Sequence, residues 1–349
     1  MLSPDILIFS HARDEHAQAV LRRLPHTCTP LIIDLRDFGS GLVGSLNPLV
    51  QGEISLRLPS GEGVCLQSVQ SVWWRRPTYL SAPKNCEERY KSFLEFEQKQ
   101  FLDGLISLMP HETKFFNHPD AHAKMDRKAY QLRCATEVGL SIPATCITSD
   151  AAKAAEFLDS IDEAIYKSFW GTEDFWQPTR RVDKSIIENL HLLSMGPVIF
   201  QEYIEGCRDL RVTFVDGQVE VVAFDLNQSR YKYDVRIDTR IKASKHTLPL
   251  KIFEKIQKFC SLSELNYAAI DLRERPDGEF VFFEVNPAGQ FLYLDYLAGT
   301  DLVGTFSSAL SRSSSTPSHE KTGIRDGRPP VLDATIPLNA IGAEIAHLT

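Results

Sequence analysis

The stretch Phe280–Pro287 (FVFFEVNP) places a carboxylate and an amide inside an otherwise apolar run. The stretch Tyr267–Arg273 (YAAIDLR) has the same character, and a Pro-Asp-Gly turn sequence between the two predicts a β-hairpin. Glu284 and Asn286 are two residues apart, so on a strand their side chains point to one face. The tight turn brings Asp271 across from them. We therefore expect two carboxylates and an amide oxygen on one face of a sheet.

The oxygen atoms of these three side chains are hard donors, which suit Mg²⁺, an ion that keeps waters and shares phosphate oxygens. A charged surface hairpin is the ordinary alternative. Against that alternative, a carboxylate embedded in a strongly apolar strand needs a partner. The hairpin therefore predicts a Mg²⁺ site formed by Asp271, Glu284 and Asn286.

Two lysines upstream are candidates for binding a triphosphate. Lys167 ends an apolar strand candidate, Ala164–Ser168 (AIYKS), and Lys128 lies on a helix that we expect over Lys124–Val138. An ATP site needs cations, and lysine commonly binds phosphate as a point charge. A solvated surface lysine is the commoner case, although a lysine at the end of a buried strand is less ordinary.

A strand candidate runs out into a linker between the lysines and the hairpin, at Gln201, Glu202, Tyr203 and Ile204. Extended backbone there could offer N–H and C=O groups to an adenine edge, and Glu205 or Asp209 could reach a ribose hydroxyl. The alternative is that this segment only connects two domains. The geometry of an extended segment would allow it both to connect domains and to contact adenine.

Two arginines follow this linker. Arg211 lies on a strand candidate directly after it, and Arg236 lies in the segment YKYDVRID. Because arginine pairs bidentately with carboxylate or phosphate, both are candidates for contacting a transferred phosphoryl group or a substrate acid. An arginine considered by itself is more often an ordinary surface residue than a ligand of phosphate or substrate.

The chain has 349 residues, a length that usually divides into two or three domains. Short apolar strands alternate with helical patterns in the first third, which indicates an α/β unit. Later segments indicate α+β units with hairpins, one of which we expect to turn at Asp216-Gly217, between strand candidates Leu210–Val215 and Val219–Phe224. We expect units at 1–116, 117–203 and 204–310, followed by a flexible linker and tail at 311–349 that is rich in Ser, Pro and Gly.

Composition narrows the function classes. The net charge of −8 argues against general affinity for nucleic acid or anionic membranes. The seven cysteines include no CxxC pair, which favours reduced thiols over a disulfide framework. The first residues lack a basic start and a long apolar run, and no segment is apolar for long enough to cross a bilayer. We expect a cytoplasmic protein.

The order of these motifs resembles the ATP-grasp superfamily. A lysine on a helix, a lysine ending a strand, QEYI, DLRVTF and D…FFEVNPAGQ follow one another over roughly Asn117–Leu310. The resemblance implies an ATP-grasp fold, in which ATP lies between two α+β subdomains and an N-terminal α/β (pre-ATP-grasp) domain helps to hold the substrate. ATP and Mg²⁺ are the cofactors that it implies.

Within the superfamily, VWWRRP, NHPDAHAKMDRKAYQLRCATEVGLSIP and EVNPAGQFLYLD resemble the graspetide (microviridin-type) ligases. Such enzymes form ester or amide crosslinks between side chains of a ribosomally made precursor peptide, so the resemblance implies a partner with leader and core segments. A homodimer is an expectation from the family alone. The roles that the resemblance implies are ATP phosphates for Lys128 and Lys167, adenine for Glu202 and Ile204, ribose for Asp209, Mg²⁺ for Asp271, Glu284 and Asn286, and phosphate and substrate for Arg211 and Arg236.

The expected activity is that of a ligase that activates a carboxylate as an acyl phosphate and transfers it to an amine or hydroxyl. No protein nucleophile is needed for this chemistry, which agrees with the lack of a Ser-His-Asp or Cys-His motif. Three alternatives stay open: a ligase that joins free amino acids or small peptides, a nucleotide-binding protein without catalysis, and an adaptor that binds a partner through its tail.

Overall fold

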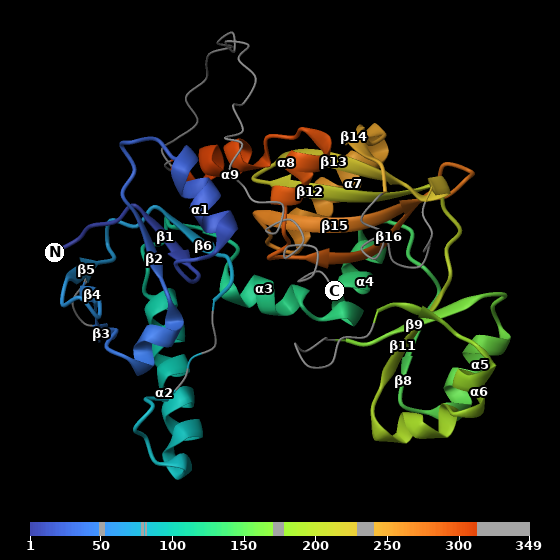
Figure 1. The fold of residues 1–349 in the computed structure, drawn as a ribbon, viewed down its shortest axis with the longest axis horizontal. Coiled ribbons are helices and arrows are strands. Elements are labelled where there is room, and N and C mark those ends of the chain that lie inside the picture. Colours follow the sequence, from blue (N-terminus) through green and yellow to red (C-terminus); the bar gives the residue numbers. More distant parts are fainter. Residues whose placement is uncertain (49–52, 78–79, 81, 170–177, 229–240, 313–349) are drawn as a thin grey trace, which may run out of the picture.

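A computed structural model describes residues 1–48, 53–77, 80, 82–169, 178–228 and 241–312, whose strands form four sheets (Figure 1). Arg236 and the tail from residue 313 onward lie outside the described residues. The first sheet is wholly parallel, in the order β2-β1-β6-β7, and its strands are β1 Ile6–Phe9, β2 Pro30–Ile33, β6 Ser71–Trp74 and β7 Lys114–Phe116.

The apolar run in β1 is buried along its whole length, as expected for a parallel strand covered on both faces. Helix α1 (Glu15–Arg23) follows it and is capped by Asp14, whose carboxylate accepts hydrogen bonds from two backbone N–H groups. The other elements of this region are η1 Leu35–Gly39, β3 Val43–Asn47, β4 Glu53–Arg57, β5 Gly63–Cys65 and α2 Glu88–Ser107, with β3, β4 and β5 forming a separate antiparallel sheet.

The second four-stranded sheet is antiparallel, in the order β10-β9-β11-β8. Its elements are β8 Thr145–Thr148, α5 Ala151–Asp159, β9 Ala164–Lys167, β10 Arg180–Arg181, α6 Lys184–Glu188, η2 Leu190–Met195 and β11 Val198–Glu202. Phe200 of β11 packs with Ala154 and Leu193 in a small core between this sheet and its helices.

The largest sheet has five antiparallel strands, in the order β14-β13-β12-β15-β16. Its elements are β12 Arg208–Val215, β13 Gln218–Asp225, η3 Leu226–Gln228, β14 Ala243–His246, α7 Leu250–Leu262, β15 Tyr267–Glu274 and β16 Phe280–Asn286. The expected hairpin β15–β16 is confirmed, and so is β12–β13, which turns at Asp216 and Gly217 with positive φ at both residues. Helix α7 covers one face of this sheet.

The prediction of a single helix over Lys124–Val138 was wrong. The chain forms two helices in this region, α3 (Pro119–Met125) and α4 (Lys128–Glu137). Arg127 between them has extended backbone dihedral angles. Within the buried core, the Gln131 side chain donates a hydrogen bond to the Met125 carbonyl, an acceptor that the helix end leaves without an intrahelical partner. Lys128 therefore stands at the first position of α4, not inside a helix.

Two helices follow β16: α8 (Leu292–Ala298) lies over the five-stranded sheet, and α9 (Leu302–Ser311) returns to the first sheet (Figure 1). Phe306 of α9 lies with its ring centroid 4.4 Å from that of Trp73 on β6. The Ser71 hydroxyl donates to the Leu310 carbonyl over 2.7 Å. One core thus joins the beginning of the chain to the segment that follows β16.

Candidate active site

One face of the five-stranded sheet packs against α7. The other, here called the polar face, carries charged side chains on its central strands, whereas Val222 and Phe224 of β13 join the core with α8 and α9. Leu210 and Val212 belong to the core under α7, so Arg211 between them lies on the opposite face. Asp271 of β15 and Glu284 of β16 are partners in register, and Asn286 follows two residues later. The three proposed metal ligands therefore share the polar face, as the alternation predicted.

A register shift next to Asp271 shapes this face. The pairing passes from Asp271–Glu284 to Leu272–Phe282, so Phe283 is the extra residue of a β-bulge. Phe282 stays in the core, whereas Phe283 lies 5.1 Å below the guanidinium carbon of Arg273. The bulge thus lets two consecutive residues, Phe283 and Glu284, contribute to the polar side of the strand.

Glu284 forms an ion pair with Lys128. The Lys128 Nζ lies 2.6 Å from the Glu284 Oε2, and the two side chains are only 23% and 25% exposed. The break between α3 and α4 places this lysine at the start of a helix that packs against β16. A predicted phosphate ligand and a predicted metal ligand are therefore in direct contact.

Asp271 forms the second ion pair of the site, with Arg211 at 3.0 Å. The Arg211 Nε also donates to the Tyr293 hydroxyl over 3.1 Å. Although burial disfavours the charged guanidinium, the Asp271 carboxylate and the Tyr293 hydroxyl raise the pKa of Arg211 above its ordinary value. The site therefore holds a fixed, oriented cation beside its second carboxylate.

These donors fit Mg²⁺. Within the described ranges, no three carboxylate, histidine or cysteine side chains cluster closely enough to bind a metal by themselves. The third oxygen donor is instead an amide, that of Asn286, whose Oδ1 accepts from the Ala288 N–H over 2.9 Å. Two carboxylates and one amide suit an ion that completes its coordination with waters and phosphate oxygens. Glu284 and Asp271 each form an ion pair with one cation, so the net charge of these four side chains is close to zero.

Arg273 organises the segment that leads into β12. Its guanidinium pairs bidentately with Asp209 at 2.7 and 2.9 Å, and it donates to the Ile204 carbonyl over 2.9 Å. It also lies 5.9 Å from the Tyr203 ring centroid. A Cβ at Gly206 would lie 2.4 Å from the Arg273 Cγ, so only glycine allows this close packing. Asp209, which we expected at the ribose, is held by Arg273 in this structure.

The other residues of the linker motif take part in the sheet ladder. Gln201 is buried and donates from Nε2 to the Thr145 hydroxyl over 3.0 Å. Glu202 exchanges hydrogen bonds with Ala144 through both its backbone N–H and its side chain. The chain leaves the ladder at Ile204, whose carbonyl meets Arg273. Adenine binding by this segment stays a prediction.

Lys167 lies on β9, in a different sheet from the metal ligands. Its register partner is Ile199, whereas Tyr166 and Phe200 form the next pair and pack into the helical core. Lys167 therefore belongs to the face of the sheet that is turned away from α5 and η2.

Sequence reasoning missed three contributors to this region: Tyr293, Arg273 and Arg75. The alternation of Asp271 and Arg273 on one strand was a usable signal for a polar face with an arginine. Arg75 and Tyr293 lie in the stretches VWWRRP and EVNPAGQFLYLD, but the resemblance implied no role for either residue, because both reach the site from elements whose packing only the fold decides.

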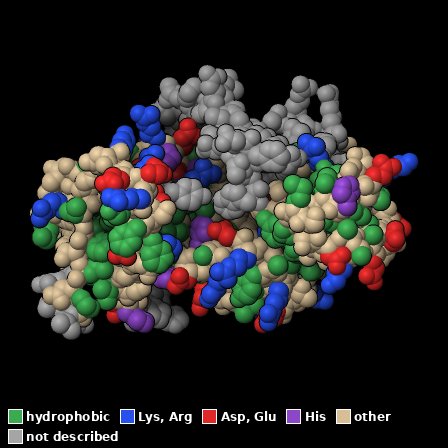
Figure 2. Space-filling model, turned by 90° about the horizontal axis from the view of Figure 1, so that it is seen from below, with side chains coloured by type: hydrophobic (Ala, Val, Ile, Leu, Met, Phe, Trp, Pro, Cys, Tyr) green, Lys and Arg blue, Asp and Glu red, His purple; other side chains and the backbone are tan. Residues whose placement is uncertain are grey.

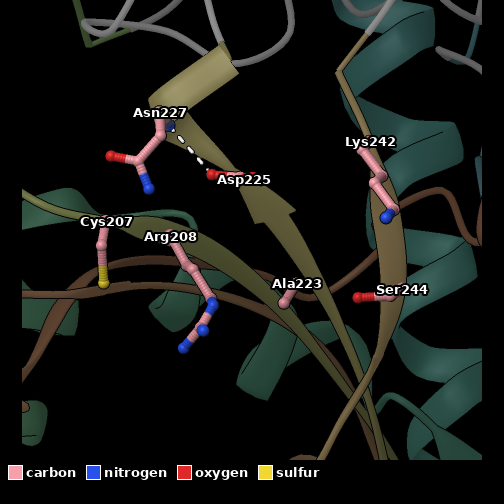
Figure 3. A pocket seen from close by; sticks show the side chains of 7 residues that line it. All are labelled: Cys207, Arg208, Ala223, Asp225, Asn227, Lys242 and Ser244. Atoms are coloured by element: carbon pink, nitrogen blue, oxygen red, sulfur yellow. Dashed lines mark hydrogen bonds between the residues drawn. The ribbon is translucent and has the colours of Figure 1, made fainter.

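A small cavity of about 210 Å³ opens elsewhere on the large sheet (Figure 3). Cys207, Arg208, Ala223, Asp225, Asn227, Lys242 and Ser244 line it. Ala223 belongs to the core beneath α7, so this cavity lies on the face opposite the ion pairs. Arg208, a cation of its lining, already pairs with Glu274 at 2.8 Å.

On the lower face of the molecule, basic and acidic side chains are interspersed (Figure 2).

Comparison with known proteins gives a consistent result at the level of structure. No protein-family model and no curated protein sequence matches the chain. The macrocyclase MdnC from Microcystis aeruginosa MRC, solved with precursor peptide MdnA, superposes with a TM-score of 0.78 at 22% identity, covering 90% of this chain and 100% of that one. A Chryseobacterium gregarium RiPP-associated ATP-grasp ligase, solved with ADP and a leader and core peptide, gives 0.78 at 25% identity, covering 89% and 96%.

The ATP-grasp ligase PsnB, solved with a phosphomimetic variant of a minimal precursor, Mg and ADP, has a TM-score of 0.75 at 21% identity, covering 89% of this chain and 98% of that one. The chain therefore has the ATP-grasp fold, and the expected resemblance to graspetide-type ligases is confirmed. Among the helices of the described residues, none is long and apolar enough to cross a membrane.

Proposed function

We propose that this chain, which has the ATP-grasp fold, is an ATP-dependent carboxylate–amine or carboxylate–hydroxyl ligase that forms side-chain ester or amide crosslinks in a ribosomally made precursor peptide. The observation that carries the proposal is the pair of contacts Lys128–Glu284 and Arg211–Asp271, which brings two cations together with two carboxylates at the polar face of the sheet. Support for a peptide substrate comes from three similar structures, which were solved with a precursor peptide, a leader and core peptide, and a variant of a minimal precursor, respectively.

ATP and Mg²⁺ are the cofactors. Asp271, Glu284 and Asn286 would hold Mg²⁺, which when bound offsets negative charge on phosphate oxygens. Lys128 and Arg211 supply positive charge for the transferring phosphoryl group, and their present carboxylate partners keep both side chains oriented. Lys167, Glu202, Ile204 and Asp209 are proposed for the nucleotide, and Arg236, outside the described residues, for phosphate or substrate.

The reaction has two balanced steps. A carboxylate oxygen of the substrate attacks the γ-phosphorus of ATP, and the bond from that phosphorus to the ADP oxygen breaks. An amine or hydroxyl then attacks the acyl carbon, loses its proton, and expels inorganic phosphate. Each crosslink removes one water mass from the peptide, so the product is recognised by mass.

Further features are proposed together with this function. The partner is a precursor peptide with leader and core segments. The chain acts in the cytoplasm and binds neither nucleic acid nor a membrane. It forms a homodimer. We propose the same functional division of the chain as above, with a substrate-assisting unit at 1–116, ATP-binding units at 117–203 and 204–310, and a tail at 311–349.

Intact-mass spectrometry of the nearest encoded short peptide, incubated with the purified chain and Mg-ATP, tests the proposal. ATP-dependent loss of whole water masses supports it. An unchanged peptide alongside steady ADP release favours free amino acids or small peptides as acceptors. Glu284→Gln is the inactive control, and Glu254→Gln, an exposed acid on α7, is its matched comparison.

A further inference from the structure

The turn after the metal ligands lies directly on the polar face of the sheet. Asn286 is the register partner of Ala269, and the chain then folds back over that residue. A Cβ at Gly289 would lie 2.3 Å from the Ala269 Cβ, so the turn and the strand are in contact through the bare glycine backbone. Any displacement of this turn therefore moves Asn286, which begins it.

Arg75, from the end of β6 in the first sheet, holds this turn by its backbone. Its side chain is 1% exposed, and its Nη1 donates to the carbonyls of Ala288 and Gly289. The Arg75 Nε lies 3.5 Å from the Asp14 Oδ2, and Ser10 donates to that same carboxylate over 2.8 Å. Although burial opposes ionisation, Arg75 and the hydrogen bonds lower the pKa of Asp14, so a charged carboxylate orients the arginine.

His16, on α1, holds the other end of the turn. Its Nε2 accepts hydrogen bonds from the N–H groups of Phe291 and Leu292, at 3.0 and 3.3 Å. The imidazole also packs edge-on against the Phe291 ring, with centroids 4.8 Å apart. Only an unprotonated Nε2 accepts hydrogen bonds. Burial, reinforced by Arg75 and Arg76, lowers the pKa of His16 well below its ordinary value and keeps it in that form.

We propose that Arg75 and His16 are positioning residues for the metal ligand Asn286, so that the N-terminal region completes the ATP site by holding the turn that follows β16. This inference rests on the proposed function. Both side chains bind backbone groups, so they constrain the path of the turn whatever its side chains are. Partners that orient a metal ligand typically change metal affinity about 10- to 100-fold when they are removed.

The test measures binding of Mn²⁺, as a spectroscopic substitute for Mg²⁺, to the full chain at saturating ADP, from the electron paramagnetic resonance signal of free Mn²⁺. Arg75→Met and His16→Leu are expected to raise the Mn²⁺ dissociation constant about 10-fold or more. His16→Gln, which retains an acceptor, is expected to stay close to wild type. Arg23→Gln is the matched control, because Arg23 also joins α1 to the C-terminal helices, through Asp301 at 3.2 Å, but lies on the surface away from the turn.

A folded Arg75→Met protein with the wild-type Mn²⁺ constant overturns the inference. If that variant does not fold, the two His16 variants decide, since equal Mn²⁺ constants for Leu and Gln contradict a role for the acceptor. A wild-type chain that binds no Mn²⁺ with ADP contradicts the proposed function itself. The two failures are thus distinguishable, and melting temperatures separate loss of metal binding from loss of folding.

Discussion

The Lys128 Nζ and the Glu284 Oε2 lie 2.6 Å apart, although 156 residues separate them in the chain. One is proposed to bind phosphate and the other Mg²⁺. Each neutralises the charge of the other, and the Arg211–Asp271 pair repeats this arrangement. Nucleotide and metal would therefore bind at charges that already attract each other, which couples the affinities of the two ligands.

Replacing Lys128 by methionine should alter the two affinities in opposite directions. Without its cationic neighbour, Glu284 has one ion pair fewer competing with Mn²⁺ in the absence of nucleotide, and we expect several-fold tighter binding. ADP loses a phosphate ligand and should bind about 10-fold more weakly. Calorimetric titration with each ligand measures both effects, with Lys251→Met, an exposed lysine on α7, as control. Unchanged affinities would exclude Lys128 from the site.

Arg211→Lys should lower kcat strongly while leaving the fold intact. The lysine keeps the charge but cannot contact Asp271 and Tyr293 together, so the cation loses its orientation. We expect a decrease of about 100-fold in the rate of ADP release with peptide present. Arg208→Lys provides the comparison on the same strand, since Arg208 pairs with Glu274 on the opposite face. Equal rates for the two variants would argue against a catalytic role for Arg211.

Gly289→Ala should lower the free energy of unfolding, and adding Ala269→Gly to that variant should restore part of the loss. The added methyl group would meet the Ala269 Cβ at 2.3 Å, an overpacking that costs about 1–3 kcal/mol. In the double variant the two Cβ atoms no longer meet, so a large favourable interaction energy is expected from the double-mutant cycle. Urea unfolding measures all four free energies. Additive effects of the two substitutions would show that turn and strand do not touch.

Acid should weaken the fold through His16. Its pKa is lowered in the folded protein, so the unfolded chain binds a proton first, as pH falls below the ordinary histidine value of about 6.5. The free energy of unfolding therefore decreases below that pH, by up to about 1.4 kcal/mol per pH unit. Asp14, Arg75 and Arg76 face the imidazole, and the lowered pKa of Asp14 adds to the loss only below about pH 3.8.

Unfolding of wild type and of His16→Gln, compared between pH 5 and pH 8, isolates this contribution. Gln has no titrating group, so the stability of the wild type relative to His16→Gln should decrease as the pH falls below about 6.5. His122, whose pKa burial also lowers, contributes equally to both proteins and cancels. Parallel curves for the two proteins would show that His16 is not the titrating group.

Local patterns were enough to predict much of the chain. The two-residue spacing of Glu284 and Asn286, the Asp-Gly turn and the buried run of β1 each depend on neighbouring residues and on hydrogen bonds within a few positions. Hence the two hairpins and the shared face of Asp271, Glu284 and Asn286 followed directly from residue order. The same kind of pattern failed at Lys124–Val138, because a buried glutamine stabilises the helix break and its partner at Val285 is 154 residues away.

Residue order alone thus specified several of the strands, the turns of two hairpins and the chemical type of the predicted site residues, since those properties are short-range. It did not specify which charges meet. The contacts of Lys128 with Glu284, and of Arg75 with the turn after β16, join segments that only the packing of several cores brings together. A buried ion pair is stable only where the geometry of both partners is already set. Tertiary structure therefore decided how the site is balanced and which region of the chain holds it in place.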